Sequence, residues 1–234
     1  MASLAQRHRT RVLAARESGK SDPGAPNPAG GVQALMMANL VNDLRRLKAI
    51  ESVERKIAAK ADMLPAYRDY VDGVLSADKG GQDEVIATVM VWHLDVGDFA
   101  RGLTIAGYVL KHDLALPERY NRKVPALLLD EVPGAVLAGK VPVNSDTMGA
   151  LQMVAVLTEG KDAPDQARAK LHRAMGETLA ALAGDTPTGP QLDMARAGLA
   201  QLNRAVALHK DVGAKKAIEQ LSRTIKKAEA SAAG

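Results

Sequence analysis

The chain has 234 residues, no cysteine and 3% aromatic residues, and its 31 Lys and Arg against 27 Asp and Glu give a formal net charge of +4. This length allows one sizeable helical domain or two small ones, and the lack of cysteine excludes disulfides and thiolate metal sites. No apolar run reaches the roughly 18 to 20 residues that span a bilayer, and the N-terminus lacks the apolar stretch of a secretory signal, so no membrane contact is expected.

The composition favours helices throughout. Ala, Leu, Val and Met are abundant, and no long stretch alternates with period two. Such residues suit helix packed on helix, because small side chains let two helices approach closely. We therefore predict an all-α fold in which a long helical hairpin and tetratricopeptide-like helical hairpins follow a basic N-terminal arm.

Positive charge gathers at the two ends of the chain. Residues 1–60 hold 11 Lys and Arg against 5 Asp and Glu, and residues 210–234 hold 6 against 3, whereas residues 61–209 hold 14 against 19. This asymmetry indicates contact with a polyanion at the ends. A solvated surface with basic tails would give the same pattern.

The first segment, 1–31, is expected to be a basic arm followed by a flexible linker. Residues 3–17 can form a short helix with Ser3 as its N-cap, and the Gly/Pro/Ser-rich stretch 18–31 cannot bury a core. The helix is therefore expected to be tethered and not packed. Its candidate DNA-binding residues are Arg7, His8, Arg9, Arg11 and Arg16, because arginine forks match phosphate geometry.

A central domain is expected over 32–126, beginning with one long helix over 32–62. Leu40, Leu44 and Leu47 begin an apolar stripe with helical spacing. This stripe would face either the next helix of the same subunit or another copy of the chain. The candidate DNA-binding residues off the stripe are Arg45, Arg46, Lys48, Arg55, Lys56 and Lys60.

The rest of this domain reads as three shorter helices. One begins near Pro65 and ends before two glycines, and the strongly apolar helix 82–94 and the helix 99–111 flank the turn Asp-Val-Gly-Asp. This last pair is locally similar to a tetratricopeptide hairpin, and Trp92 is expected to be buried in it.

A third segment, 127–234, is expected to hold C-terminal helical hairpins after a basic loop over 113–126. Pro133 interrupts its first short helix candidate. The other predicted helices cover 148–157, 165–182, 195–209 and 214–228.

Six segments in order resemble the terminase small subunit of temperate, contractile-tailed phages with cohesive-end genomes. They are SLAQRHRTRV, LKAIESVERKIAAKADMLPAYRDYVDGVL, GGQDEVIATVMVWHLDVGD, IAGYVLKHDLALP, DQARAKL and GAKKAIEQL. No single motif is decisive, and it is their order along the chain that carries the resemblance.

The resemblance implies a subunit that binds double-stranded phage DNA at the packaging or cohesive-end site and recruits the large subunit, which carries the ATPase motor. It also implies a homo-oligomer, expected to be a ring, that acts in the cytoplasm of the infected bacterial host. Members of this family are commonly labelled the endonuclease subunit of the terminase. Two alternatives stay open: a divalent-metal endonuclease that cuts the cohesive-end site, and a helical-repeat adaptor without DNA binding.

The residues themselves give little support to catalysis by this chain alone. The phosphate cradle of an ATPase, G-x-x-x-x-G-K-[ST], is absent from the sequence. Weak candidates for a metal nuclease are His93, Asp95 and Asp98. His93 and Asp95 do not share a helix face, and Asp98 suits the N-cap of the helix that follows. We therefore expect no cofactor, with Mg²⁺ required only if the nuclease alternative holds.

Overall fold

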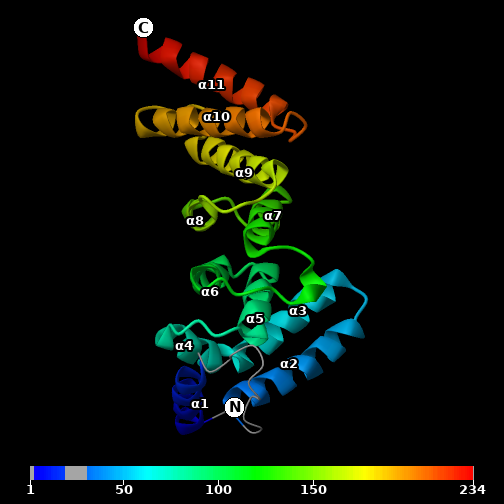
Figure 1. Ribbon diagram of the computed structural model, residues 1–234. Helices are drawn as coiled ribbons and strands as arrows, with labels where there is room; N and C mark the ends of the chain where they lie inside the picture. The colour runs from blue at the N-terminus through cyan, green and yellow to red at the C-terminus, as the bar shows by residue number, and fades with distance from the viewer. Residues whose placement is uncertain (1–2, 19–30, 234) are drawn as a thin grey trace. The chain divides into compact units, whose positions relative to one another are not determined.

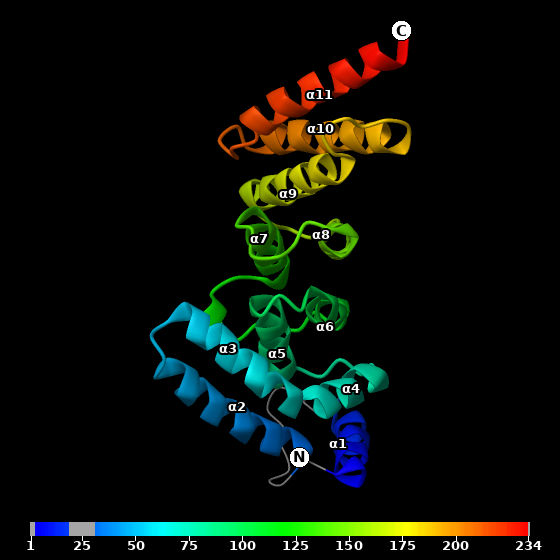
Figure 2. The ribbon, with the colours of Figure 1, turned by 180° about the vertical axis from the view of Figure 1, so that it is seen from behind.

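The computed structural model describes residues 3–18 and 31–233, and every regular element in that part of the chain is a helix (Figures 1 and 2). This confirms the predicted all-α fold, while the tetratricopeptide-like detail stays a prediction. The chain divides into two compact units, Met1–Val124 and Pro125–Gly234, here called unit 1 and unit 2. No helix in the described part is both long and apolar enough to cross a membrane. The expected linker 18–31 lies outside the described residues except for its two ends.

Unit 1 is built around an apolar helix, α5. The elements of unit 1 are α1 (Leu4–Glu17), α2 (Val32–Lys48), α3 (Val53–Met63), the 3₁₀ turn η1 (Leu64–Ala66), α4 (Arg68–Ala77), α5 (Glu84–Asp95), α6 (Phe99–Lys111) and the 3₁₀ turn η2 (Glu118–Tyr120). Nine of the 12 residues of α5 are buried, because α2, α3, α6 and η1 pack around it. Trp92 is 1% exposed, as predicted, and the ring of Tyr67 meets it edge-on with the centroids 5.9 Å apart.

The start of α5 is tied to α4 by a buried carboxylate. Asp83 caps the helix and accepts hydrogen bonds from the backbone N–H groups of Val85 and Ile86 at 2.9 and 3.2 Å. The Tyr70 hydroxyl of α4 donates to the same carboxylate at 2.5 Å. Burial raises the pKa of Asp83, and these three donors replace the water that the carboxylate loses.

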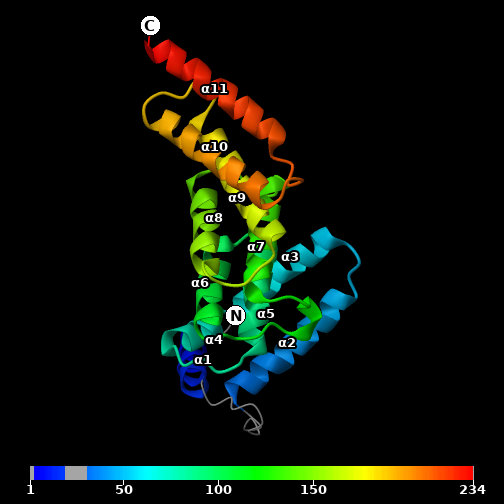
Figure 3. The ribbon, with the colours of Figure 1, turned by 45° about the horizontal axis from the view of Figure 1, so that its top comes forward.

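The single helix predicted over 32–62 is two helices. The chain leaves helical geometry between Lys48 and Val53, where Ser52 is extended and its side chain accepts a hydrogen bond from the N–H of Arg55 at 3.3 Å. A serine in this role starts a new helix, although the apolar spacing continues across the break. All three ribbon views show the turn between α2 and α3 at the outer edge of unit 1 (Figures 1, 2 and 3).

The first helix, α1, is packed and is not the unpacked arm that the sequence suggested. Its start is capped as predicted: the Ser3 side chain accepts from the N–H of Gln6 at 3.2 Å, and the Gln6 side chain accepts from the N–H of Ser3 at 2.8 Å. Ala14 is fully buried where α1 meets α4. A Cβ atom on Gly73 of α4 would lie 2.3 Å from the carbonyl oxygen of Arg11 and 2.8 Å from the Cβ of Ala14. The close approach of the two helices therefore requires glycine at this position.

Unit 2 is a series of five helices in the part of the chain that the structure describes. They are α7 (Val124–Leu137), which begins at the boundary with unit 1, α8 (Ser145–Thr158), α9 (Asp165–Ala183), α10 (Pro190–Leu208) and α11 (Lys215–Ala233). Pro133 lies inside α7 without ending it, in contrast to the expected interruption, because a helix can continue past proline at the loss of one backbone hydrogen bond.

Glycines also permit close packing of helices in unit 2. A Cβ atom on Gly176 of α9 would lie 2.6 Å from the Cγ of Leu202 and 2.9 Å from the carbonyl oxygen of Gly198, both on α10. On its other side α10 packs against α11 (Figure 3), where Leu221 and Ile225 are buried in the same cluster as Leu202.

Replacing Gly73 with alanine should loosen α1. We expect Gly73→Ala to lower the free energy of unfolding by about 1–3 kcal/mol, because the new methyl group overpacks the contact between α1 and α4. Gly149→Ala is the matched control: Gly149 is also helical, no atom outside the adjoining stretch of its own helix lies within 4 Å of its Cβ position, and alanine there should stabilise by roughly 0.5–1 kcal/mol. Urea unfolding combined with amide exchange over residues 4–17 measures both effects, and equal results for the two variants would contradict the packing described.

Candidate nucleic-acid interface and pocket

Two of the basic residues predicted on the arm are engaged inside unit 1. Arg7 donates through Nε to Asp69 of α4 at 2.8 Å, and Arg11 reaches the other oxygen of the same carboxylate at 3.1 Å. The Asp69 side chain is 14% exposed. The hydrogen bond from Arg7 lowers the pKa of Asp69, and burial opposes that shift. These two arginines therefore help to hold α1 on α4.

The other predicted basic residues of α1 face solvent. His8, Arg9 and Arg16 are exposed, and none of them forms an ion pair with a residue that the structure describes. Exposed guanidinium groups without a carboxylate partner are the groups that can replace counterions along a DNA backbone. The structure thus divides the predicted arm residues into an internal set and an outward set.

A second group of cations lies at the turn between α2 and α3. We call it the basic corner, and it consists of Arg45, Lys48, Arg55 and Lys56. Within the described part of the chain, these four side chains make no ion pair. Basic residues at the end of α2 also favour the helix dipole, which is a structural role for them apart from any ligand.

The other two predicted cations of this region are already paired. Arg46 contacts Asp43 at 2.9 Å, within its own helix. The ammonium group of Lys60 lies 2.5 Å from the carboxylate of Asp95 and joins α3 to the end of α5.

The weak catalytic candidates do not form one cluster. His93 Nδ1 lies 2.9 Å from Asp98 Oδ2, while Asp95 is taken by Lys60. The other oxygen of Asp98 accepts the N–H of Arg101 at 3.3 Å, so Asp98 is the N-cap of α6 as the sequence predicted. Among the described residues, no group of three His, Asp or Glu side chains could hold a metal ion.

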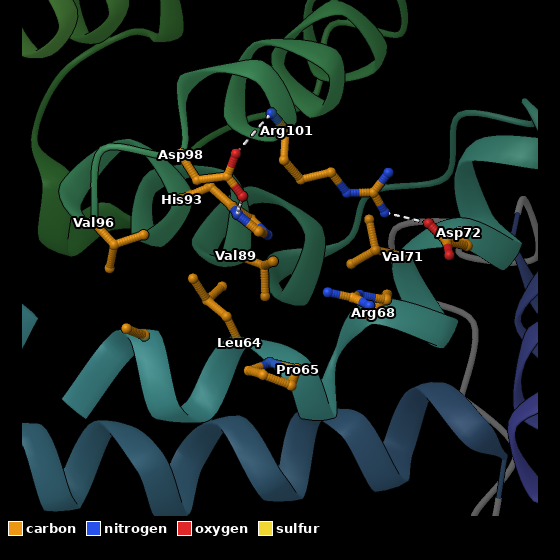
Figure 4. A pocket seen from close by; sticks show the side chains of 11 residues that line it. Leu64, Pro65, Arg68, Val71, Asp72, Val89, His93, Val96, Asp98 and Arg101 are labelled. Carbon is orange, nitrogen blue, oxygen red and sulfur yellow. Dashed lines mark hydrogen bonds and ion pairs between the residues drawn. The ribbon is translucent and has the colours of Figure 1, made fainter. Parts of the chain in front are cut away.

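A pocket of about 510 Å³ opens between α3, α4, α5 and α6 (Figure 4). Leu64, Val71 and Val89 give it an apolar lining, and His93 with Asp98 forms one polar edge. The remaining lining residues are Ala61, Pro65, Arg68, Asp72, Val96 and Arg101.

The charges around this pocket act on His93. Burial lowers the pKa of His93; the neighbouring Asp98 opposes that shift, and the positive charges of Arg101 and Arg68 add to it. Arg101 forms an ion pair with Asp72 across the pocket (Figure 4).

The sequence did not predict the polar residues that complete this pocket. Arg68 and Asp72 come from α4 and Arg101 from α6, and Arg101 lies 29 positions from Asp72. The i,i+4 spacing of Arg68 and Asp72 on one helix was the only local signal, and it fits a solvated helix face equally well.

These features define an all-helical protein with two sets of exposed cations. Residues 37–166 match the family described as the phage small terminase subunit. The chain is 39% identical over 226 residues to the "Terminase, endonuclease subunit" of Escherichia phage P2, covering 97% of this chain and 87% of that protein. It is 26% identical over 106 residues to the "Probable terminase, endonuclease subunit" of Haemophilus phage HP1 (strain HP1c1), covering 44% and 37%. No solved structure matches the chain.

The protein therefore belongs to the phage small terminase subunit family, as its resemblance predicted. Membership gives it a role in the packaging of phage DNA.

His93 should make the protein less stable in acid. The pKa of His93 in the folded chain lies below the ordinary 6.5. Below pH 6.5 the unfolded chain therefore binds more protons than the folded chain, and the free energy of unfolding falls as the pH is lowered. Above pH 6.5 His93 is neutral in both states and does not change the free energy of unfolding. His93→Gln removes this titration and keeps a side chain that can bond to Asp98. Urea unfolding at about pH 7.5 and about pH 5 should show a smaller loss on acidification for the variant than for the original protein. Equal losses would show that His93 does not contribute.

Proposed function

We propose that this protein binds double-stranded phage DNA at the packaging or cohesive-end site and recruits the large ATPase subunit of the terminase. The observation that carries the proposal is the set of cations without ion-pair partners among the described residues, at His8, Arg9 and Arg16 of α1 and at the basic corner. All of them are exposed except Lys56, which is half-buried. Family membership supports the same conclusion, because a small terminase subunit has a role in packaging.

We further propose that the protein acts as a homo-oligomeric ring. On α1 and at the basic corner a single copy offers only a few cations without ion-pair partners among the described residues, and each contact with a phosphate contributes little in physiological salt. Several copies in one assembly would multiply these contacts and give avidity without strong binding by each copy.

Binding to a cohesive-end duplex, measured against salt concentration, tests the proposal. We expect Arg9→Gln with Arg16→Gln to flatten the dependence of log K on log salt by about 2 for each copy that contacts the duplex, because each lost phosphate contact removes roughly 0.9 from the slope. Arg45→Gln with Arg55→Gln should act in the same direction. The matched control is Arg7→Gln with Arg11→Gln, which should loosen α1 and leave the slope nearly unchanged, because Asp69 already holds both groups.

Light scattering in the same samples gives the absolute mass with and without DNA. A large discrete oligomer that gains the mass of the duplex supports the proposal. A protein that ignores DNA at low salt and still binds the large subunit would establish the adaptor alternative instead.

A divalent-metal endonuclease is the second candidate, because the names of both similar phage proteins contain the word endonuclease. The close pair of His93 and Asp98 would be its first suspect. We expect the purified chain alone to leave cohesive-end DNA intact in Mg²⁺. Cleavage that disappears in Asp98→Asn would contradict this expectation, since asparagine still caps α6 but lacks the charge that a metal ion requires. Asp95→Asn is the control, because Asp95 is the third candidate residue but pairs with Lys60 and not with His93.

A further inference from the structure

The pocket of unit 1 offers one cation that no carboxylate neutralises. Arg68 is exposed and has no ion-pair partner within the described residues, and Figure 4 draws its guanidinium group in the pocket without a bond to its neighbours. Arg101, in contrast, is held by Asp72, and His93 by Asp98. The free polar group of this pocket is therefore a planar guanidinium, whose preferred partner is a carboxylate or a phosphate.

The surface beside Arg68 is apolar. Leu64, Val71 and Val89 line the pocket next to it, with Pro65 and Val96 in the same lining (Figure 4). A volume of about 510 Å³ is in the range of sites that enclose a ligand and has room for large side chains of a partner. The site thus suits an apolar anchor residue that has a carboxylate close to it.

We propose that this pocket binds an acidic, apolar peptide segment of the large ATPase subunit. The inference rests on the proposed function, because recruitment of that subunit requires a docking surface on this chain. It assigns that surface to unit 1 and separates it from the cations proposed to contact DNA. Arg68 would pair with the carboxylate of the segment, and the apolar lining would bury its anchor side chain.

The chemistry of the pocket favours a peptide over DNA. Protein surfaces that bind DNA are strongly positive and polar, whereas most residues that line this pocket are apolar and its two arginines are matched by two aspartates. A permanent contact between copies of the chain would be larger and more apolar than one pocket crossed by the ion pair of Arg101 and Asp72. This mixture of apolar and charged groups suits a partner that binds transiently.

Two variants test the two parts of the proposed contact separately, namely the ion pair with Arg68 and the burial of the apolar anchor side chain. Arg68→Glu reverses the free charge at an exposed position. Ala61→Trp fills the pocket from its exposed rim and leaves every charge in place. Arg45→Glu, in the basic corner, is the matched control for charge reversal. Circular dichroism and unfolding curves verify that each variant keeps the fold.

The experiment measures the affinity of each variant for the purified large subunit of the same phage, and for cohesive-end DNA in parallel. We expect Arg68→Glu and Ala61→Trp each to weaken binding of the large subunit at least tenfold and to leave DNA binding near that of the original protein. Arg45→Glu should show the reverse pattern. If the acidic residue of the large-subunit segment that pairs with Arg68 is replaced by lysine, binding to the Arg68→Glu variant should be restored, because the two charges are then exchanged.

Four results would overturn the inference. If both pocket variants bind the large subunit as the original protein does, the docking surface lies elsewhere, while the proposed function stands. If Arg68→Glu weakens DNA binding instead, the pocket belongs to the DNA interface. If the pocket variants lower the mass of the oligomer, the occupant is a second copy. If the original protein itself does not bind the large subunit, both the inference and the proposed recruitment fail. In the other three cases the original protein still binds the large subunit, and only the inference fails.

Discussion

The burial of α5 is the constraint on which the rest of unit 1 depends. A helix that is apolar on all its sides is stable only when other helices cover it completely, and α2, α3, α6 and η1 do so. Its buried N-cap, Asp83, is satisfied in part by Tyr70 of α4, so the position of α4 is coupled to the start of α5. The placement of α1, which packs on α4, follows from this arrangement, as does the pocket, which takes Val89 and His93 from α5.

Ion pairs then divide the cations by role. Arg7, Arg11, Lys60 and Arg101 lie close to carboxylates of other helices and contribute to packing. Arg9, Arg16 and the basic corner have no such partners among the described residues, and they carry the proposed DNA contact. Net charge alone would count both groups equally. The distinction matters for function because only a cation free of an internal carboxylate can neutralise a phosphate without first breaking a bond.

The proposed activities require different chemistry, and unit 1 offers both. DNA binding needs cations on a polar, hydrated surface, which the exposed side of α1 and the basic corner supply. Recruitment of a protein partner needs an apolar anchor site with a few oriented polar groups, which the pocket with Arg68 supplies. A subunit that holds DNA and the motor at the same time benefits from such a separation, since neither partner then competes for the surface of the other.

The sequence by itself determined the all-α fold, the caps at Ser3 and Asp98, the burial of Trp92 and the family, because helical spacing, capping and ordered segments are local properties of a chain. It also identified the basic residues, but not which of them remain free. Arg7 and Asp69 are 62 positions apart, and Lys60 and Asp95 are 35 apart, so their pairing depends on how helices pack. The break at Ser52 follows from a local serine cap that the continuing apolar spacing obscured. The docking of α1 on Gly73 and the pocket around Arg68 were decided only by the tertiary structure, because each depends on contacts that the linear order does not contain.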